Sequence, residues 1–232
     1  MSRRGWTRYN GRWRIICWAL GAVMLTDRDA IAQLIPDATL GSENSIANPQ
    51  VINGLPSDQI DGGAIRGSNL LHSFQEFNVG EGRGVYFANP NGIERIITRV
   101  TGGNTSQILG NLGVLGNADL FLLNPNGIIF GSNARLDLNG SFIGSTASSI
   151  RFALGIEFSA TNPQAPPLLN INIPLGLQYG TNPGAMINRS SDRTIEPTLQ
   201  VAPGRTFALV GGDVLVEGDS DINFHSRNWR YW

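Results

Sequence analysis

The sequence predicts an all-β fold, in which a parallel β-helix is favoured over a β-sandwich. Apolar runs between Ile93 and Gly144 are short and continuous instead of alternating, which is typical of strands buried inside a coil. The corners between them are rich in Asn and Gly but are not two-residue hairpins throughout. Asn124-Pro125-Asn126-Gly127 joins two such runs, and Asn89-Pro90-Asn91-Gly92 repeats it 35 residues upstream. A recurring corner indicates stacked coils, and the spacing is expected to be one or two coils.

Residues 1–32 are predicted to be a cleaved secretory signal peptide. Arginines precede an apolar run from Ile15 to Leu25, and Ala30 and Ala32 supply small residues at alternate positions, so cleavage is expected before Gln33. A transmembrane anchor is the alternative. The run of eleven residues is too short for it, because a spanning helix needs about twenty.

Composition then limits the partners of the remaining chain. Removal of residues 1–32 leaves eleven arginines against sixteen acidic residues, a net charge of −5. An acidic body without a basic run argues against nucleic acid and against anionic membrane surfaces as partners. The only cysteine, Cys17, lies in the signal segment. The mature fold is therefore expected to depend on packing and backbone hydrogen bonds, without disulfides.

The body, residues 33–218, is predicted to begin with a cap and continue as coils. Residues 33–68 are rich in turns and are expected to form short strands over the open end of the stack, because exposed strand edges recruit other strands. From Asn69 to Val79 the alternation of apolar residues breaks between Phe74 and Phe77, which predicts a bend or bulge near Gln75-Glu76.

The later part of the body is expected to leave the coil and then return to it. Residues 156–204 hold seven of the twelve prolines, and proline is confined to strand edges and loops. This segment is therefore predicted to pack on the flank, with one possible strand from Leu168 to Ile173. The coil pattern resumes over 206–218. Residues 219–232 form an atypical tail, either a C-terminal cap or the product of truncation or a frameshift.

The sequence offers no recognisable catalytic motif, and neither enzyme activity nor a cofactor or metal is predicted. It lacks HExxH, a P-loop and Gly-x-Ser-x-Gly, and its two histidines are His72 and His225. Some β-helix proteins cut polysaccharides, and four charged residues are the candidates for that chemistry: Glu94, Asp119, Arg135 and Asp137. Each lies beside a turn, where charged residues are ordinarily solvated. Asp61-Gly62-Gly63 lacks the repeated nonapeptide of calcium-binding coils.

Several separated segments resemble the N-terminal secretion (TPS) domain of filamentous-haemagglutinin-like exoproteins of two-partner secretion systems, most closely the cyanobacterial versions. They occur in the family's order and cover about residues 33–218. The matching segments are Leu71–Val79, Val85–Ile93, Arg99–Gly102, Ile108–Gly113, Leu120–Arg135, Gly140–Thr146 and Thr206–Gly212.

The resemblance implies a right-handed, single-stranded parallel β-helix of the pectin-lyase-like kind, with an N-terminal cap and flanking extra-helical β elements. It further implies export by the Sec machinery, recognition in the periplasm by an outer-membrane transporter, and release as a secreted or surface protein without stable membrane insertion. A monomer is expected. In the family, the motifs corresponding to Asn89–Gly92 and Asn124–Gly127 are needed for secretion, mainly as turns that set the fold.

Two other functions remain open from the residues alone. One is a self-contained surface adhesin or carbohydrate-binding protein, and the other is a β-helix lyase. Family members usually continue into a long repetitive passenger, and the chain stops where the secretion domain is expected to end, so an effector activity is not predicted.

Overall fold

The computed structural model describes residues 34–166, 173–190 and 199–217. These residues form a parallel β-solenoid of about six turns, with almost no helix. The helical content of the described part is two three-residue 3-10 turns, η1 (Gly41–Glu43) and η2 (Ala153–Gly155). The predicted fold class is confirmed, and the sandwich is excluded by the parallel pairing of successive coils.

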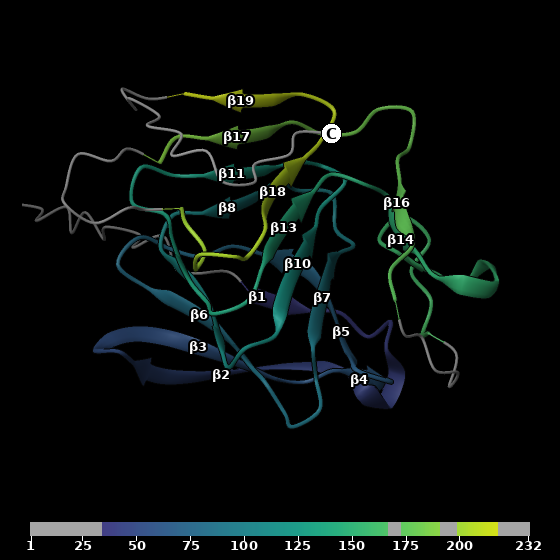
Figure 1. Cartoon of the computed structure of the whole chain (residues 1–232), viewed down its shortest axis with the longest axis horizontal. Helices are drawn as coiled ribbons and strands as arrows, with labels where there is room; N and C mark the ends of the chain where they lie inside the picture. The colour runs from purple at the N-terminus through teal and green to yellow at the C-terminus, as the bar shows by residue number, and fades with distance from the viewer. Residues whose placement is uncertain (1–33, 167–172, 191–198, 218–232) are drawn as a thin grey trace, which may run out of the picture.

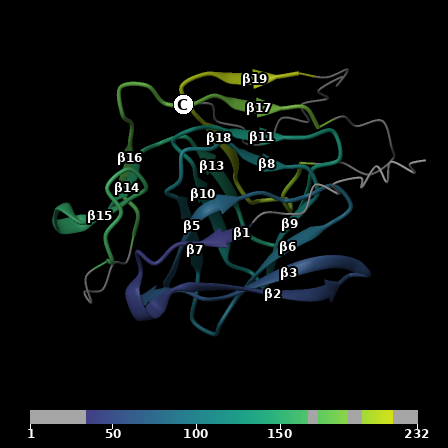
Figure 2. The same ribbon diagram turned by 180° about the vertical axis from the view of Figure 1, so that it is seen from behind.

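Three sheets form the sides of the solenoid (Figures 1 and 2). Sheet A contains β1 (Leu34–Pro36), β4 (Ala64–Arg66), β5 (Asn69–Phe77), β7 (Arg95–Val100), β10 (Asp119–Leu123), β13 (Phe142–Ser145) and β18 (Phe207–Val210). Sheet B contains β2 (Ser45–Ile52), β3 (Leu55–Gly62), β6 (Gly84–Ala88), β9 (Asn111–Leu115) and β12 (Arg135–Asp137). Sheet C contains β8 (Ser106–Ile108), β11 (Ile128–Phe130), β17 (Met186–Asn188) and β19 (Val214–Val216).

From β7 to β13 the chain visits the sheets in the repeating order A, C, B. Leu120 of β10 pairs in parallel with Ile96 of β7 and with Phe142 of β13, so neighbouring coils are 24 and 22 residues apart. Because a coil returns above itself after this interval, side chains at equivalent positions form stacks through the interior.

Apolar side chains from all three sheets fill the interior. Phe77 and Phe87 stack with their ring centroids 5.9 Å apart, and Phe142 lies 5.9 Å from Phe130 in an edge-on contact. All four rings are buried, together with most of the leucines and isoleucines of the coils. The short apolar runs of the sequence are therefore the interior-facing sides of the coils.

The N-terminal cap contains longer strands than the sequence predicted. β2 and β3 are eight residues each and form an antiparallel hairpin whose turn, Asn53-Gly54, has positive φ at both residues. This geometry is the usual two-residue hairpin. β3 continues as a parallel neighbour of β6, whereas β1 and β4 pair antiparallel with β5. The cap therefore covers the N-terminal edges of sheets A and B, as expected, but not with short strands alone.

The predicted irregularity in β5 is confirmed. The register between β1 and β5 shifts so that Ile35 pairs with Glu76 and Pro36 with Phe74, which leaves Gln75 opposite no residue of β1. The extra residue allows Phe74 and Phe77 both to be buried in the interior although they have opposite parity.

The extra-helical segment is only partly where it was predicted. Three antiparallel strands, β14 (Ser149–Arg151), β15 (Glu157–Ser159) and β16 (Gly176–Gln178), form sheet D on the flank of sheet A (Figures 1 and 2). The departure begins at Ser149, before residue 156. β17 lies inside the predicted excursion, yet it pairs in parallel with β11 and β19 as part of the coil. A three-residue strand between prolines has no sequence signal that separates it from a loop, which explains the error. Most of the possible strand from Leu168 lies outside the described residues.

Candidate functional site

The corner Asn124–Gly127 turns the chain from β10 in sheet A to β11 in sheet C. Asn124 is fully buried, and its side-chain amide donates to Asn104 O and Ser106 Oγ, each at 2.9 Å. Its Oδ1 accepts from the backbone N–H of Asn126 at 2.9 Å, a local bond typical of asparagine at the start of a turn. Its own N–H donates to Ser145 O at 3.0 Å. Asn124 therefore joins the preceding coil to the following one while it closes the turn.

Gly127 completes this corner because no other residue fits its position. Its φ is +119°, and its N–H donates to Asn124 O at 3.0 Å. A Cβ placed there would lie 2.8 Å from Ala185 O on the next coil. Both the backbone conformation and the close approach of the coils require glycine.

The corner Asn89–Gly92 turns the chain from β6 in sheet B to β7 in sheet A. The Asn89 Oδ1 accepts from the backbone N–H groups of Asn117 at 2.9 Å and Ala118 at 3.1 Å, both in the next coil. Its amide donates to Ile93 O at 3.1 Å. Pro90, Asn91 and Gly92 are exposed, and a Cβ at Gly92 would meet no atom within 4 Å.

The two corners are therefore not equivalent positions of successive coils, and the expected spacing of one or two coils is wrong. Their separation of 35 residues is about one and a half times the repeat of 22 to 24 residues. The same four residues were selected at two different sides of the coil because both sides need a tight turn. Of the two asparagines that open the corners, only the buried Asn124 is hydrogen-bonded both to the preceding coil and to the following coil.

The charged residues considered for polysaccharide cleavage are dispersed. Asp119 Oδ1 accepts from the N–H of Ser141 at 2.7 Å, and Glu94 forms an ion pair with Arg95 at 3.2 Å. These two acids lie near the corner between sheets B and A. Arg135 and Asp137 belong to β12 in sheet B, where Asp137 accepts from the hydroxyl of Tyr86 at 3.0 Å. Each of the three acids has a structural bond, and no catalytic arrangement unites the four residues.

Neither the histidine nor the acidic turn forms a metal site in the described part of the chain. There, no group of three His, Cys, Asp or Glu residues could hold a metal ion. Asp61 accepts from the side chains of Asn48 and Gln59, both at 2.8 Å.

His72 is fully buried in β5, with Nδ1 3.0 Å from Ser45 Oγ, and burial lowers its pKa to about 3. His225 lies outside the described residues.

A partly buried polar cluster under the cap was not predicted from the sequence. Asp37 accepts hydrogen bonds from Thr39 Oγ1 at 2.6 Å, Ser73 Oγ at 2.8 Å and Thr101 Oγ1 at 2.6 Å. Burial acts to raise the pKa of Asp37, but these bonds outweigh it and hold the pKa below its ordinary value. The cluster thus ties residues 37–39 to β5 and to the end of β7.

Two arginines of sheet A extend this cluster to the extra-helical segment. Arg99 is fully buried, and its guanidinium donates to Thr39 Oγ1 at 2.7 Å, Ser73 Oγ at 2.9 Å and the backbone oxygens of Ser159 at 2.9 Å and Gln164 at 3.1 Å. Its Cζ lies 4.1 Å from the centroid of the Phe158 ring. Burial lowers the pKa of Arg99 to about 10 and Asp37 opposes this, so the group stays charged at neutral pH.

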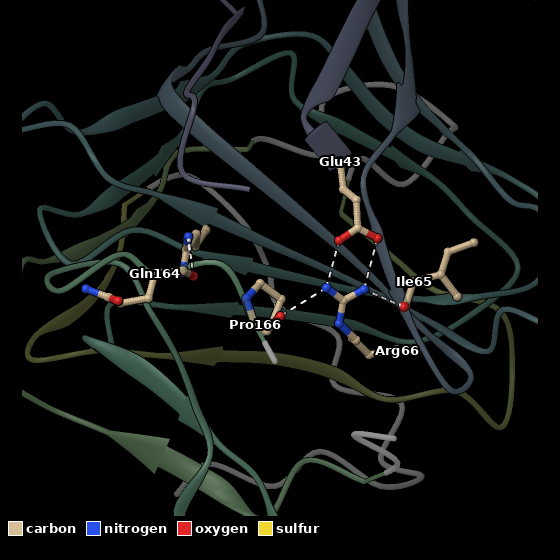
Figure 3. A network of polar contacts seen from close by, with 6 residues as sticks. Glu43, Ile65, Arg66, Gln164 and Pro166 are labelled. Carbon is tan, nitrogen blue, oxygen red and sulfur yellow. Dashed lines mark hydrogen bonds and ion pairs between the residues drawn. The ribbon is translucent and has the colours of Figure 1, made fainter. Parts of the chain in front are cut away.

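Arg66 makes a parallel connection at the end of β4 (Figure 3). Its guanidinium donates to both carboxylate oxygens of Glu43, at 3.0 and 2.7 Å, and to Pro166 O at 3.0 Å. Figure 3 shows Glu43 and Pro166 on two different sides of the guanidinium. The hydrogen bonds from Arg66 lower the pKa of Glu43. Asp37, Glu43, Arg66 and Arg99 are hereafter called the arginine clip.

Part of these sites is predictable from the sequence. The two Asn-Pro-Asn-Gly corners were identified correctly as turns, and Arg99 belongs to one of the segments that carry the family resemblance. Asp37 and Glu43 were missed because isolated acids in a turn-rich segment look like solvated surface residues. The expected cleavage residues Ala30, Ala32 and Gln33 lie outside the described residues. In the described part, no helix is long and apolar enough to cross a membrane.

Comparison with known proteins connects this fold to secretion. The family model described as "TPS secretion domain" matches residues 32–228. Two proteins of Haemophilus influenzae, both named heme/hemopexin-binding protein, are 38% identical over 69 residues and 37% identical over 67 residues. These matches cover 30% and 29% of the present chain but only 7% of each relative, so the chain resembles a small part of much longer proteins.

Proposed function

Because the chain belongs to the TPS secretion domain family and is the secretion-targeting module of a two-partner secretion exoprotein, we propose that the periplasmic domains of its outer-membrane transporter bind this module during export. The observation that carries the proposal is the family match over residues 32–228, which spans the whole solenoid and its cap. The proposed route is export by Sec with removal of the signal peptide between Ala32 and Gln33, passage through the periplasm, and folding outside the cell as a monomer.

Strand pairing is the proposed mode of recognition. A chain that has not completed its coils offers unpaired N–H and C=O groups along strand edges, and a strand of the transporter can add to such an edge. In the finished fold, β2 is the outermost strand at the N-terminal end of sheet B among the described residues, and β12 is outermost at the other end. Pro49 lies near the centre of β2 and has no backbone N–H, so a further strand can form fewer hydrogen bonds with β2. The incomplete chain is therefore the better ligand.

The two Asn-Pro-Asn-Gly corners serve this function indirectly in our proposal. Asn124 is buried and Gly127 faces the next coil, so neither is available to touch a transporter in the folded state. Their role is to let the coils stack. The heme and hemopexin binding named for the relatives is not proposed for this chain, because the match covers only 7% of each relative.

Co-expression with the transporter tests the proposed function. We expect the chain to appear in the medium or on the cell surface only when the transporter is present, and Asn124→Ala and Gly127→Val to abolish that appearance. Arg189→Gln is the control, because Arg189 lies outside both motifs and its side chain forms only an exposed ion pair with Glu217. Secretion without the transporter, or normal secretion of both corner variants, would contradict the proposal.

A further inference from the structure

The outer edge of β5 is covered by short pieces of the N-terminal cap. β4 pairs with residues 69–71, and β1 pairs with residues 74, 76 and 77. Between them, the N–H of Asp37 donates to Ser73 O at 3.3 Å and Ser45 Oγ accepts from the N–H of Ser73 at 3.1 Å. A nine-residue strand of sheet A is thus closed by two three-residue strands and two single contacts.

The groups that hold this cover in place depend on residues far along the chain. Arg99 joins Thr39 of the cap to the carbonyls of Ser159 and Gln164, which lie 60 and 65 residues downstream of it. Arg66 joins Glu43 to the carbonyl of Pro166, 100 residues downstream. A buried guanidinium requires several acceptors at once, because an unpaired buried charge costs several kcal/mol. The clip is complete only when residues 159–166 have docked.

Apolar packing of the cap also depends on the extra-helical segment. Leu40 is 3% exposed and belongs to a cluster on the outer face of sheet A. The partners that cover this cluster include Ile150, Phe152 and Phe158 of the extra-helical segment. Without that segment, Leu40 would lose much of its burial, and the polar bonds of the clip would be exposed to water, where they are weaker.

We propose that the arginine clip makes closure of the N-terminal cap over β5 conditional on docking of residues 159–166. The cap and the extra-helical segment close as one unit, after the central coils have stacked. Until then the edge of β5 is open. This inference rests on the proposed function for its purpose: the open edge is where a strand of the transporter can pair, and arrival of residues 159–166 ends that opportunity.

Pulse-labelling hydrogen exchange during refolding of the purified full chain tests the order of closure. Reporters for the cap are the amides of Asp37 and Thr39, which are bonded to Ser73 O and Asp37 Oδ1. Reporters for the extra-helical segment are the amides of Ala160 and Asn162, bonded to Ser148 O and Ser159 Oγ. We expect these four amides to gain protection together, after the coil amide of Leu120. Protection of the cap amides before those of Ala160 and Asn162 would overturn the inference.

Variants of the clip test the coupling in the folded state. Arg99→Gln should raise exchange at the cap and at residues 160–162 together, by at least tenfold, while Leu120 stays protected. Arg99→Lys, which keeps the charge but loses the forked donors, is the milder variant if Arg99→Gln does not fold. Arg189→Gln is the matched control, because Arg189 forms an exposed ion pair with Glu217 and follows β17 of sheet C, whereas the cap strands belong to sheets A and B. Faster exchange at only one of the two segments would contradict the coupling.

The outcome is separate from that of the proposed function, because the refolding experiment contains no transporter. Coupled closure together with absence of transporter-dependent secretion would overturn the function and leave the clip intact. Uncoupled closure together with transporter-dependent secretion would overturn the proposed role of the clip and leave the proposed function intact.

Discussion

At the scale of single residues, the two asparagines that open the corner motifs do different work. Asn124 is buried and makes bonds to two neighbouring coils and to its own turn, whereas Asn89 is half-buried and bonds one neighbouring coil. Identical sequence motifs therefore do not imply identical energetic weight. Burial decides the difference, because an unsatisfied group is costly only where water cannot replace the lost partner.

Alanine substitutions along the motifs should follow this ranking. We expect Asn124→Ala to lower the free energy of unfolding by roughly 2–3 kcal/mol, since it leaves buried groups such as Ser106 Oγ with one partner fewer. Asn89→Ala should cost about 1 kcal/mol, and the exposed Asn91→Ala less than about 0.5 kcal/mol. Urea unfolding of the three variants measures these values, and equal losses at Asn124 and Asn91 would contradict the ranking.

His72 should make the fold sensitive to acid. Its folded pKa of about 3 lies below the ordinary value of 6.5 because burial disfavours the imidazolium, although the charge of Asp61 opposes this. Between pH 6.5 and about 3, His72 is therefore protonated in the unfolded state but neutral in the folded state. The contribution to stability is complete above pH 6.5 and is lost as the pH falls towards 3.

Unfolding between pH 7 and 5 tests this point before the carboxylates titrate. Stability should fall steadily over this range, and His72→Phe should remove most of the slope, because the variant has no proton to take up. Asp37, whose pKa is lowered, adds acid sensitivity only below its ordinary value of 3.8. An unchanged slope in His72→Phe would contradict the assignment.

At the scale of elements, the corners differ in how closely the neighbouring coil approaches. Gly92 and Gly127 both have positive φ, but only at Gly127 would a Cβ meet backbone of the next coil. Gly92→Ala should therefore cost about 1 kcal/mol of unfolding free energy from backbone strain alone. Gly127→Ala should cost roughly 2–3 kcal/mol, because a clash is added. Thermal and urea unfolding distinguish the two, and equal costs would show that the coils adjust.

The extra-helical sheet is the element least predictable from the sequence. Its prolines signalled a departure from the coil, but β14 begins before them and β17 returns to the coil among them. Strands of three residues carry too few side chains to show a period. The pairing that defines them comes from strands distant in sequence, so it could not be predicted locally.

At the scale of the whole molecule, the architecture was predictable because the same physical demand recurs in each coil. Continuous apolar runs mark interior strands, and Asn or Gly marks the corners, so repetition compensates for the weakness of each short signal. The arginine clip was not predictable for the opposite reason. It occurs once, and it joins Asp37 and Glu43 to carbonyls more than 100 residues away that have no side-chain signature. The closer resemblance to cyanobacterial domains stays a prediction.

The proposed function requires that the periplasmic domains of a transporter bind this chain. The most direct measurement is a calorimetric titration of those domains with the purified full chain. It is done once while the chain is refolding and once after refolding is complete. We predict saturable binding of one transporter per chain, stronger for the refolding chain than for the finished fold, and retained by the Arg189→Gln control. No binding in either state, with the chain shown to refold, would contradict recognition of this domain by the transporter.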